Sequence, residues 1–270
     1  MDIKKYTEAN RQAWNEAIVI HRRGAKVNLI DEFKKPGYST LDEVVTEKLE
    51  RLGLENKSVC QICCNNGREL LSIINLGARD GVGFDIADEA VTEANQLRDI
   101  SGLDCQFVRG DIYDIGEKYK DKFDLVFISI GALCWLPDLK RLFGIAADML
   151  KTSGALLIYE LHPITYIFAA PGEKDFDPGA PLKVCNPYFQ TEPVISSEGF
   201  DYVGKTTYKA KPSYDFPHTF GHILTSIANS GITIEEVTEY NHDISALFEH
   251  LGRDSKIPLS YTLVGKKPNR

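Results

Sequence analysis

Between residues 57 and 162 the sequence alternates strand-like and helical segments, and this alternation limits the possible folds more than any other feature. The apolar runs that read as strands are separated by stretches with helical spacing, and they are SVCQIC, DGVGFD, CQFVRG, FDLVFISIG and GALLIYEL. FDLVFISIG is apolar almost throughout, as in a strand that is buried on both faces of a sheet. Strands and helices in strict alternation indicate a parallel sheet with right-handed crossovers. The sequence therefore predicts an α/β fold.

The regions on either side of this alternating core differ from it. Apolar residues at helical spacing around Trp14 and Leu49 predict two N-terminal helices. After His162 comes a stretch rich in Pro, Gly, Tyr and Phe that is too long for a plain connection, so it predicts a lid or a substrate-facing insertion. The predicted parts are an N-terminal helical cap (1–56), a cofactor-binding Rossmann-like core (57–162), a substrate-side insertion (163–217), and a C-terminal helix with the last two strands of the sheet (218–270).

Composition excludes several classes of function. The chain has 270 residues with a formal net charge of −8, which argues against non-specific binding to nucleic acid because phosphate contacts need a basic face. The first residues lack the apolar segment of a signal peptide, and no apolar run is long enough to span a bilayer. We therefore expect a cytoplasmic protein with reduced thiols and with neither a membrane nor a nucleic acid as its partner.

The stretch VCQICCNNGREL contains the first strand, its loop and the start of the next helix. In a doubly wound sheet, ligands bind at the carboxyl ends of the strands. Gly67 lies where the backbone must approach such a ligand, and the following helix offers unpaired N–H groups. Asp85 ends the second strand, where it can accept hydrogen bonds from ribose hydroxyls, and Asp111 follows the third strand. This loop and the two acids together predict a nucleoside site.

The same stretch contains Cys60, Cys63 and Cys64, which raises the question of a metal or redox site. A structural zinc site needs four ligands, and no second CxxC or His pair lies at a suitable spacing. A thioredoxin-like motif begins its helix at the first cysteine, whereas Cys60 lies inside the predicted strand. The simpler interpretation is that these are buried thiols in a strand and a turn, and we expect no metal ion.

The sequence resembles the class I S-adenosylmethionine-dependent methyltransferases. The segments that carry the resemblance are QICCNNGRE, GVGFDIADEAV, FVRGDIYD, FDLVFISIGALCWLPDL, AADMLKTSGALLIYELHP and HTFGHILTSIANSGITIEEVTEY. The resemblance implies a Rossmann-like, mostly parallel sheet of seven strands with the last strand antiparallel. It also implies helices on both faces, an N-terminal helical cap, an insertion after strand five, and S-adenosyl-L-methionine as the cofactor.

The loop departs from the usual pattern of that family, which is acid, apolar, Gly, Cys, Gly, any residue, Gly. Here Gln61 stands at the acid position, and Cys63 and Asn65 replace the first two glycines. Asn tolerates positive φ better than other non-glycine residues, so Asn65 can keep the turn. Gln61 lacks the charge that could hold the ammonium group of the cofactor. The resemblance implies that the cofactor-binding residues are Gln61, Cys63, Asn65, Gly67, Asp85, Ile86, Asp111, Ile112 and Ser129.

Methyl transfer from a sulfonium is an in-line displacement, so the protein mainly has to position the acceptor, exclude water and remove a proton. Glu160 and His162, in the segment YELHP, are the candidate catalytic residues because the resemblance places them at the substrate-facing edge. His162 would orient or deprotonate the acceptor. In the alternative interpretation, His162 caps the end of the strand and braces Pro163.

Candidate substrate-binding residues come from three regions, and they are Tyr6, Trp14, His21, Trp135 and His218. The first three belong to the N-terminal helix, which could cover the cofactor or could simply pack on the edge of the sheet. A tryptophan at the position of Trp135 more often packs under the loop after strand four than contacts a substrate. His218 and His222 have a spacing that could bind a metal, but they are more typical of histidines in a pocket wall.

The predicted function is transfer of a methyl group to a small-molecule acceptor. The alternative is a non-catalytic protein that binds S-adenosylmethionine or S-adenosylhomocysteine through a degenerate methyltransferase fold, as the altered loop would allow. A nicotinamide enzyme is a weaker candidate, because its fingerprint needs three glycines and the loop has one. The sequence predicts no particular oligomeric state.

Overall fold

A seven-stranded sheet is the centre of the computed structural model, which describes residues 2–201, 203–204, 206–252 and 256–269. Its strand order is β3-β2-β1-β4-β5-β9-β8. β9 runs antiparallel to both of its neighbours, β5 and β8, as predicted for the last strand. The strands are β1 (Ser58–Ile62), β2 (Asp80–Asp85), β3 (Cys105–Arg109), β4 (Phe123–Ser129), β5 (Leu150–Leu161), β8 (Thr233–Tyr240) and β9 (Ser260–Lys266). The predicted fold class is therefore confirmed.

Helices cover both faces of this sheet because alternate residues of each strand point to opposite faces. Val59 of β1 packs in one apolar cluster with residues of three helices, which are α3 (Glu43–Leu52), α4 (Arg68–Asn75) and α5 (Asp88–Ser101). Its neighbour Cys60 packs in a second cluster with residues of α6 (Leu139–Met149) and α7 (Phe220–Asn229). All five residues of β1 are buried, as expected for a central strand between two helical layers.

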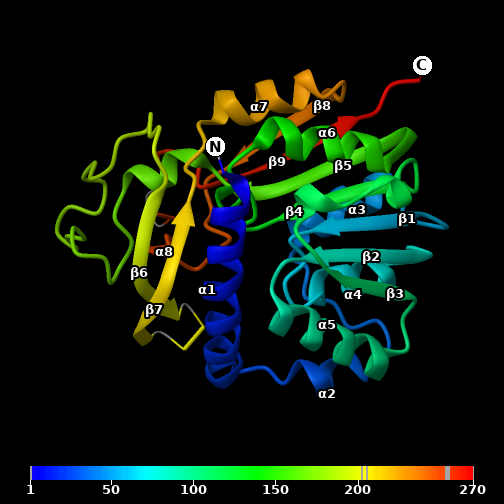
Figure 1. Ribbon diagram of the computed structural model, residues 1–270, viewed down its shortest axis with the longest axis horizontal. Helices are drawn as coiled ribbons and strands as arrows, with labels where there is room; N and C mark the ends of the chain where they lie inside the picture. Colours follow the sequence, from blue (N-terminus) through cyan, green and yellow to red (C-terminus); the bar gives the residue numbers. More distant parts are fainter. Residues whose placement is uncertain (1, 202, 205, 253–255, 270) are drawn as a thin grey trace.

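The segment after β5 adds a second, two-stranded sheet, made of β6 (Val194–Asp201) and β7 (Thr206–Asp215). The N-terminal helix α1 (Ile3–Gly24) lies between this sheet and the core, and it contacts β7 on one side and α5 on the other (Figure 1). Asn10 fixes α1 to β7, since its side chain donates to the carbonyl of Tyr214 at 2.8 Å and accepts from the Tyr214 amide at 2.7 Å. The two strands of the insertion therefore pack against one side of α1.

Short helices complete the structure. They are α2 (Leu29–Phe33), α8 (Glu249–Gly252) and the 3-10 turns η1 (Ile112–Asp114), η2 (Glu117–Tyr119), η3 (Leu133–Trp135) and η4 (Pro163–Ile167). Within the described residues, no helix has the length and apolar character needed to cross a membrane. Two of these turns, η3 after β4 and η4 after β5, lie at the edge of the sheet where a ligand is expected.

The strand order reverses between β1 and β4, because the chain first builds outward through β2 and β3 and then continues on the other side of β1. At such a switch point the loops after the two neighbouring strands diverge and leave a crevice at the carboxyl ends of the strands. The site predicted from the loop after β1 is therefore at the expected place in the fold.

Candidate functional site

The loop between β1 and α4 turns back on itself through three residues with positive φ. These are Cys63 at 56°, Asn65 at 49° and Gly67 at 74°. A side chain at Gly67 would clash with the ring of Phe107 and lie 3.0 Å from Cβ of Ala94, so this position requires glycine. Asn65 keeps the turn as predicted, while the positive φ of Cys63 was not foreseen. The loop therefore retains a tight turn although two of its usual glycines are replaced.

Asp85, at the end of β2, supports this loop. Its carboxylate accepts hydrogen bonds from the backbone N–H of Asn65 at 2.8 Å and of Ala87 at 2.9 Å. Burial raises the pKa of Asp85, although the backbone N–H groups that it accepts from oppose the shift. Each carboxylate oxygen has two lone pairs, so Asp85 can hold the loop and still accept hydrogen bonds from a diol.

Asp111, after β3, lies under the first turns of α1. Its carboxylate accepts from the hydroxyl of Thr7 at 2.7 Å, from Nζ of Lys4 at 3.1 Å and from the backbone N–H of Tyr113 at 3.0 Å. A pocket of about 560 Å³ opens between α1 and the ends of β2 and β3, and its walls include Thr7, Ile86 and Asp111. Ile112 follows as the first residue of η1 and is buried.

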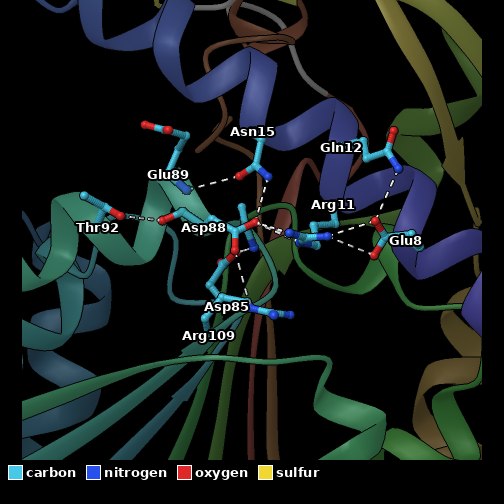
Figure 2. Close-up of polar contacts among 10 residues, drawn as sticks. Glu8, Arg11, Gln12, Asn15, Asp85, Asp88, Glu89, Thr92 and Arg109 are labelled. Atoms are coloured by element: carbon cyan, nitrogen blue, oxygen red, sulfur yellow. Dashed lines mark hydrogen bonds and ion pairs between the residues drawn. The ribbon is translucent and has the colours of Figure 1, made fainter.

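Polar contacts hold α1 over this pocket (Figure 2). The side chains of Arg11 and Asn15 both donate to Oδ2 of Asp88 at the start of α5, at 2.8 and 2.9 Å. Asn15 also accepts from the backbone N–H of Glu89 at 3.1 Å. The helix that begins just after Asp85 is thus tied directly to the helix that covers the site.

A buried polar group lies at the other end of the loop, where β1 and β4 end. Nε2 of Gln61 donates to Oε2 of Glu69 at 2.7 Å and to Oγ of Ser129 at 3.0 Å. The Ser129 hydroxyl in turn donates to the same carboxylate oxygen of Glu69. Oε1 of Gln61 is buried and has no hydrogen-bond partner. An unpaired buried acceptor is costly, and a ligand with an N–H group would satisfy it.

Glu69 was not predicted as a site residue, yet it restores the charge that Gln61 lacks. It lies in the first turn of α4, where a carboxylate also suits the helix dipole. Its side chain reaches back to the end of β1 and brings a carboxylate beside Gln61. The segment GREL places an acid in the first turn of the helix, but residue spacing alone does not show that its side chain points back toward β1.

The cysteines of the loop are unpaired thiols. Cys60 and Cys64 are buried in the strand and the loop, as the simpler interpretation of these cysteines predicted, while Cys63 is half-buried. Burial raises the pKa of all three thiols, and the nearby Asp85 carboxylate raises the pKa of Cys63 and Cys64 as well. Within the described part of the chain, no three potential metal-ligating side chains lie together.

The side chain of Glu160 forms its hydrogen bonds with backbone N–H groups of the protein. Its carboxylate accepts from the N–H groups of Gly131 at 2.8 Å, Ala132 at 2.6 Å and Leu133 at 3.0 Å, and from that of Leu161 at 3.1 Å. These contacts fix η3, the turn after β4. Burial raises the pKa of Glu160 to about 7, against the four N–H groups that lower it. This geometry favours a positioning role over that of a base.

Both ring nitrogens of His162 lie close to other groups of the protein. Nδ1 accepts from the backbone N–H of Ile164 at 3.1 Å. Nε2 lies 3.0 Å from Oε1 of Glu239, close enough for an ion pair although not aligned for a hydrogen bond. Burial lowers the pKa of His162, and Glu239 opposes this shift. The contact with Ile164 is the cap of η4, so the geometry favours the interpretation in which His162 braces this turn.

Most of the predicted substrate-binding residues come together between α1 and the loops. Tyr6 makes edge contacts with Tyr214 and Phe216, with ring centroids 4.9 and 5.3 Å apart. Trp14 makes an edge contact with Trp135 of η3 at 5.3 Å. Tyr6 thus joins α1 to the end of β7, and Trp14 joins α1 to η3; we refer to these two groups of rings together as the aromatic wall.

The two predicted histidines lie at the margins of this wall. His218 is 2.8 Å from the carbonyl of Leu136, and burial lowers its pKa to about 4, so it is neutral at neutral pH. His21 lies 4.0 Å from the carboxylate of Asp201 in β6, and its ring is 6.2 Å from that of Trp14.

Comparison with known sequences agrees with this geometry. Residues 59–154 match the family model described as Methyltransferase domain. A curated relative, Ribosomal RNA large subunit methyltransferase I of Aeromonas hydrophila, is 27% identical over 164 residues. That match covers 53% of this chain and 40% of the relative, so the chain spans less than half of that protein's length.

Solved structures share the fold at low sequence identity. A Listeria monocytogenes protein whose description names an S-adenosylmethionine-dependent methyltransferase is 19% identical with a TM-score of 0.60, covering 84% of this chain and 100% of that chain. Geranyl diphosphate C-methyltransferase from Streptomyces coelicolor, solved with S-adenosyl-L-homocysteine, is 12% identical with a TM-score of 0.56, covering 84% and 78%. The match of residues 59–154 to the methyltransferase domain and the fold shared with these structures support the predicted resemblance to class I S-adenosylmethionine-dependent methyltransferases and the predicted cofactor.

The residues at the site fit this cofactor. Asp85 offers carboxylate lone pairs to a ribose, and Gly67 leaves room where a side chain would not fit. The unpaired Oε1 of Gln61 and the carboxylate of Glu69 suit an ammonium group, which supplies several N–H donors and a positive charge.

The first prediction concerns Glu69. We expect Glu69→Gln to weaken binding of S-adenosylhomocysteine by about tenfold, the effect of losing one charged hydrogen bond. Methylthioadenosine lacks the amino acid part, so its affinity should not change. Calorimetric titration of both ligands measures this, with the exposed Glu55→Gln as the control. Equal losses for the two ligands would contradict an ammonium-binding role.

The second prediction concerns Glu160 and pH. The folded protein holds the proton of Glu160 to about pH 7, above the ordinary 4.5, so this carboxyl favours folding below that window and its contribution is lost as pH rises through it. We compare the free energy of unfolding of the wild-type protein with that of Glu160→Gln. As the pH rises from 4.5 to about 7, the wild-type value should fall by about 3 kcal/mol relative to that of the variant. Urea unfolding at several pH values measures the difference, and a difference independent of pH would rule the assignment out.

Proposed function

We propose that the protein transfers the methyl group of S-adenosylmethionine to a small-molecule acceptor. The observation that carries this proposal is the placement of three groups at one switch point of the sheet. The turn at Gly67, the carboxylate of Asp85 and the Gln61–Ser129–Glu69 group all lie at the carboxyl ends of neighbouring strands. The turn at Gly67 lets the backbone approach the cofactor closely, Asp85 suits its ribose, and the Gln61–Ser129–Glu69 group suits its amino acid part.

The segments around the site support a small acceptor. Helix α1 and the β7 end of the insertion close over the edge of the sheet, and the aromatic wall of Tyr6, Trp14 and Trp135 lines that closure. The chain also has a net charge of −8, which disfavours a polyanionic substrate. The relative named as a ribosomal RNA methyltransferase suggests RNA instead, but this chain spans only 40% of it. We place the protein in the cytoplasm, as its composition favours, and assign residues 163–217 to the substrate side.

Bound S-adenosylmethionine supplies an activated methyl group, so the residues of the chain have to position the acceptor and exclude water. Glu160 positions η3 by holding its N–H groups, and η3 carries Trp135. Tyr6 and Trp14 of α1 cover the same space from above. We assign to Glu160 and His162 the task of shaping the loops rather than contact with the acceptor.

The altered loop also supports the second candidate, a protein that binds the cofactor without transferring the methyl group. Cys63 and Asn65 replace glycines there, and Asp111 already has contacts with Thr7 and Lys4 of α1. A binding protein could keep the nucleoside site and close α1 over it permanently.

The test is release of S-adenosylhomocysteine from S-adenosylmethionine in the presence of two pools of acceptors. One pool is an ultrafiltered metabolite extract and the other is total ribosomal RNA. We expect product with the filtrate and none with RNA. Heat-inactivated protein is the control. Product with RNA alone would contradict the small acceptor, and binding of the cofactor with no product in either pool would favour the non-catalytic candidate.

A further inference from the structure

Asp215 is a buried carboxylate that the sequence did not indicate and that the cofactor site does not use. It ends β7, and the next residue, Phe216, donates its N–H to the carbonyl of Cys134 in η3 at 2.7 Å. The insertion is therefore joined to the turn after β4 at this point. Oδ1 of Asp215 is buried and has no hydrogen-bond partner. A buried carboxylate oxygen without a donor is costly, and a bound ligand with an N–H group would relieve that cost.

The groups around Asp215 form a chain of donors and acceptors. The hydroxyl of Tyr166 is within hydrogen-bonding reach of the Cys134 thiol, and the thiol is within reach of the Asp215 carboxylate. Tyr166 comes from η4 after β5, and Cys134 from η3 after β4. Three separate segments, each placed by the fold at the acceptor side, thus meet at one buried carboxylate.

This cluster adjoins the cofactor loop through Glu160. The Glu160 carboxylate caps η3 and acts electrostatically both on Cys63 of the loop and on Cys134 and Tyr166 of the cluster. Glu160 is therefore close enough to both the cofactor loop and the cluster to act on each of them.

The ionisable side chains in this region are mainly acids. Burial, with a smaller effect of the neighbouring Glu173 carboxylate, raises the pKa of Asp215 to about 7. Glu160 is the third acid of the region, and His218 at its margin is neutral because burial lowers its pKa to about 4. A cationic ligand is attracted to such a site, whereas a carboxylate is repelled.

We propose that Asp215 binds and deprotonates an amine acceptor, a role that rests on the proposed function. The acceptor enters as an ammonium and donates N–H to Oδ1, which takes one proton. The lone pair of the neutral amine then forms the new N–C bond, and the electron pair of the broken C–S bond stays on sulfur. The product leaves as a methylated ammonium, and the proton on Asp215 passes to solvent.

The aromatic wall fixes the rest of the acceptor. Tyr6 contacts Phe216, which directly follows Asp215, and Trp135 directly follows Cys134. Aromatic faces attract cations and bury apolar groups. The acceptor class is therefore an amine on an apolar or aromatic skeleton.

Three matched probes test the proposal on protein saturated with S-adenosylhomocysteine: 2-phenylethylamine, 2-phenylethanol and phenylacetate. Saturation-transfer NMR should detect the amine above the other two. Asp215→Asn should reduce the amine signal at least fivefold while leaving the affinity for S-adenosylhomocysteine unchanged, and the exposed Asp175→Asn should change neither. The comparison of the three probes uses the wild-type protein alone, so it still tests the proposal if the Asp215→Asn variant does not fold.

Different results would overturn the proposed function and the role of Asp215. If wild-type protein does not bind S-adenosylhomocysteine, the proposed function itself fails. If it binds S-adenosylhomocysteine but prefers the alcohol or the carboxylate, or if Asp215→Asn binds the amine as well as wild type does, the role of Asp215 is overturned while the cofactor site stands.

Discussion

The hydrogen bonds of the Asp85 carboxylate are the interaction on which the rest of the site depends. They tie the end of β2 to the backbone of Asn65 and to Ala87, just before α5. A loop that lacks two of its usual glycines is thereby held in its turn by a neighbouring strand. The next residue, Ile86, lines the pocket, so the carboxylate that we expect to bind the ribose also holds the loop beside the pocket.

A second dependence runs through α1. This helix is fixed to β7 by Asn10 and to Asp111, after β3, by Thr7. Arg11 and Asn15 fix it to α5 (Figure 2). Its contacts join the cofactor side to the insertion. The pocket and the aromatic wall therefore lie under a single cover, and a change in the position of α1 would alter both.

The sequence predicted what depends on periodicity and on position along a strand. Alternation predicted the sheet, and the ends of the strands predicted the loop, Asp85 and Asp111, because the carboxyl ends of parallel strands meet at one edge. Sequence could not show where side chains point. Glu69 reaches back from α4 to replace the charge missing at Gln61, and Glu160 turns toward four backbone N–H groups. Asp215 joins the site only because the insertion folds back onto η3, a long-range contact without a local signal.

The most direct test of the account is calorimetric titration of S-adenosylhomocysteine into the wild-type protein and into Asp85→Ala. The exposed Asp99→Ala removes the same charge elsewhere and is the control. We predict about micromolar binding to the wild-type protein, at least tenfold weaker binding to Asp85→Ala, and no change in the control. A folded wild-type protein that does not bind the ligand, or equal affinities for wild type and Asp85→Ala, would contradict the assignment of this site to the cofactor.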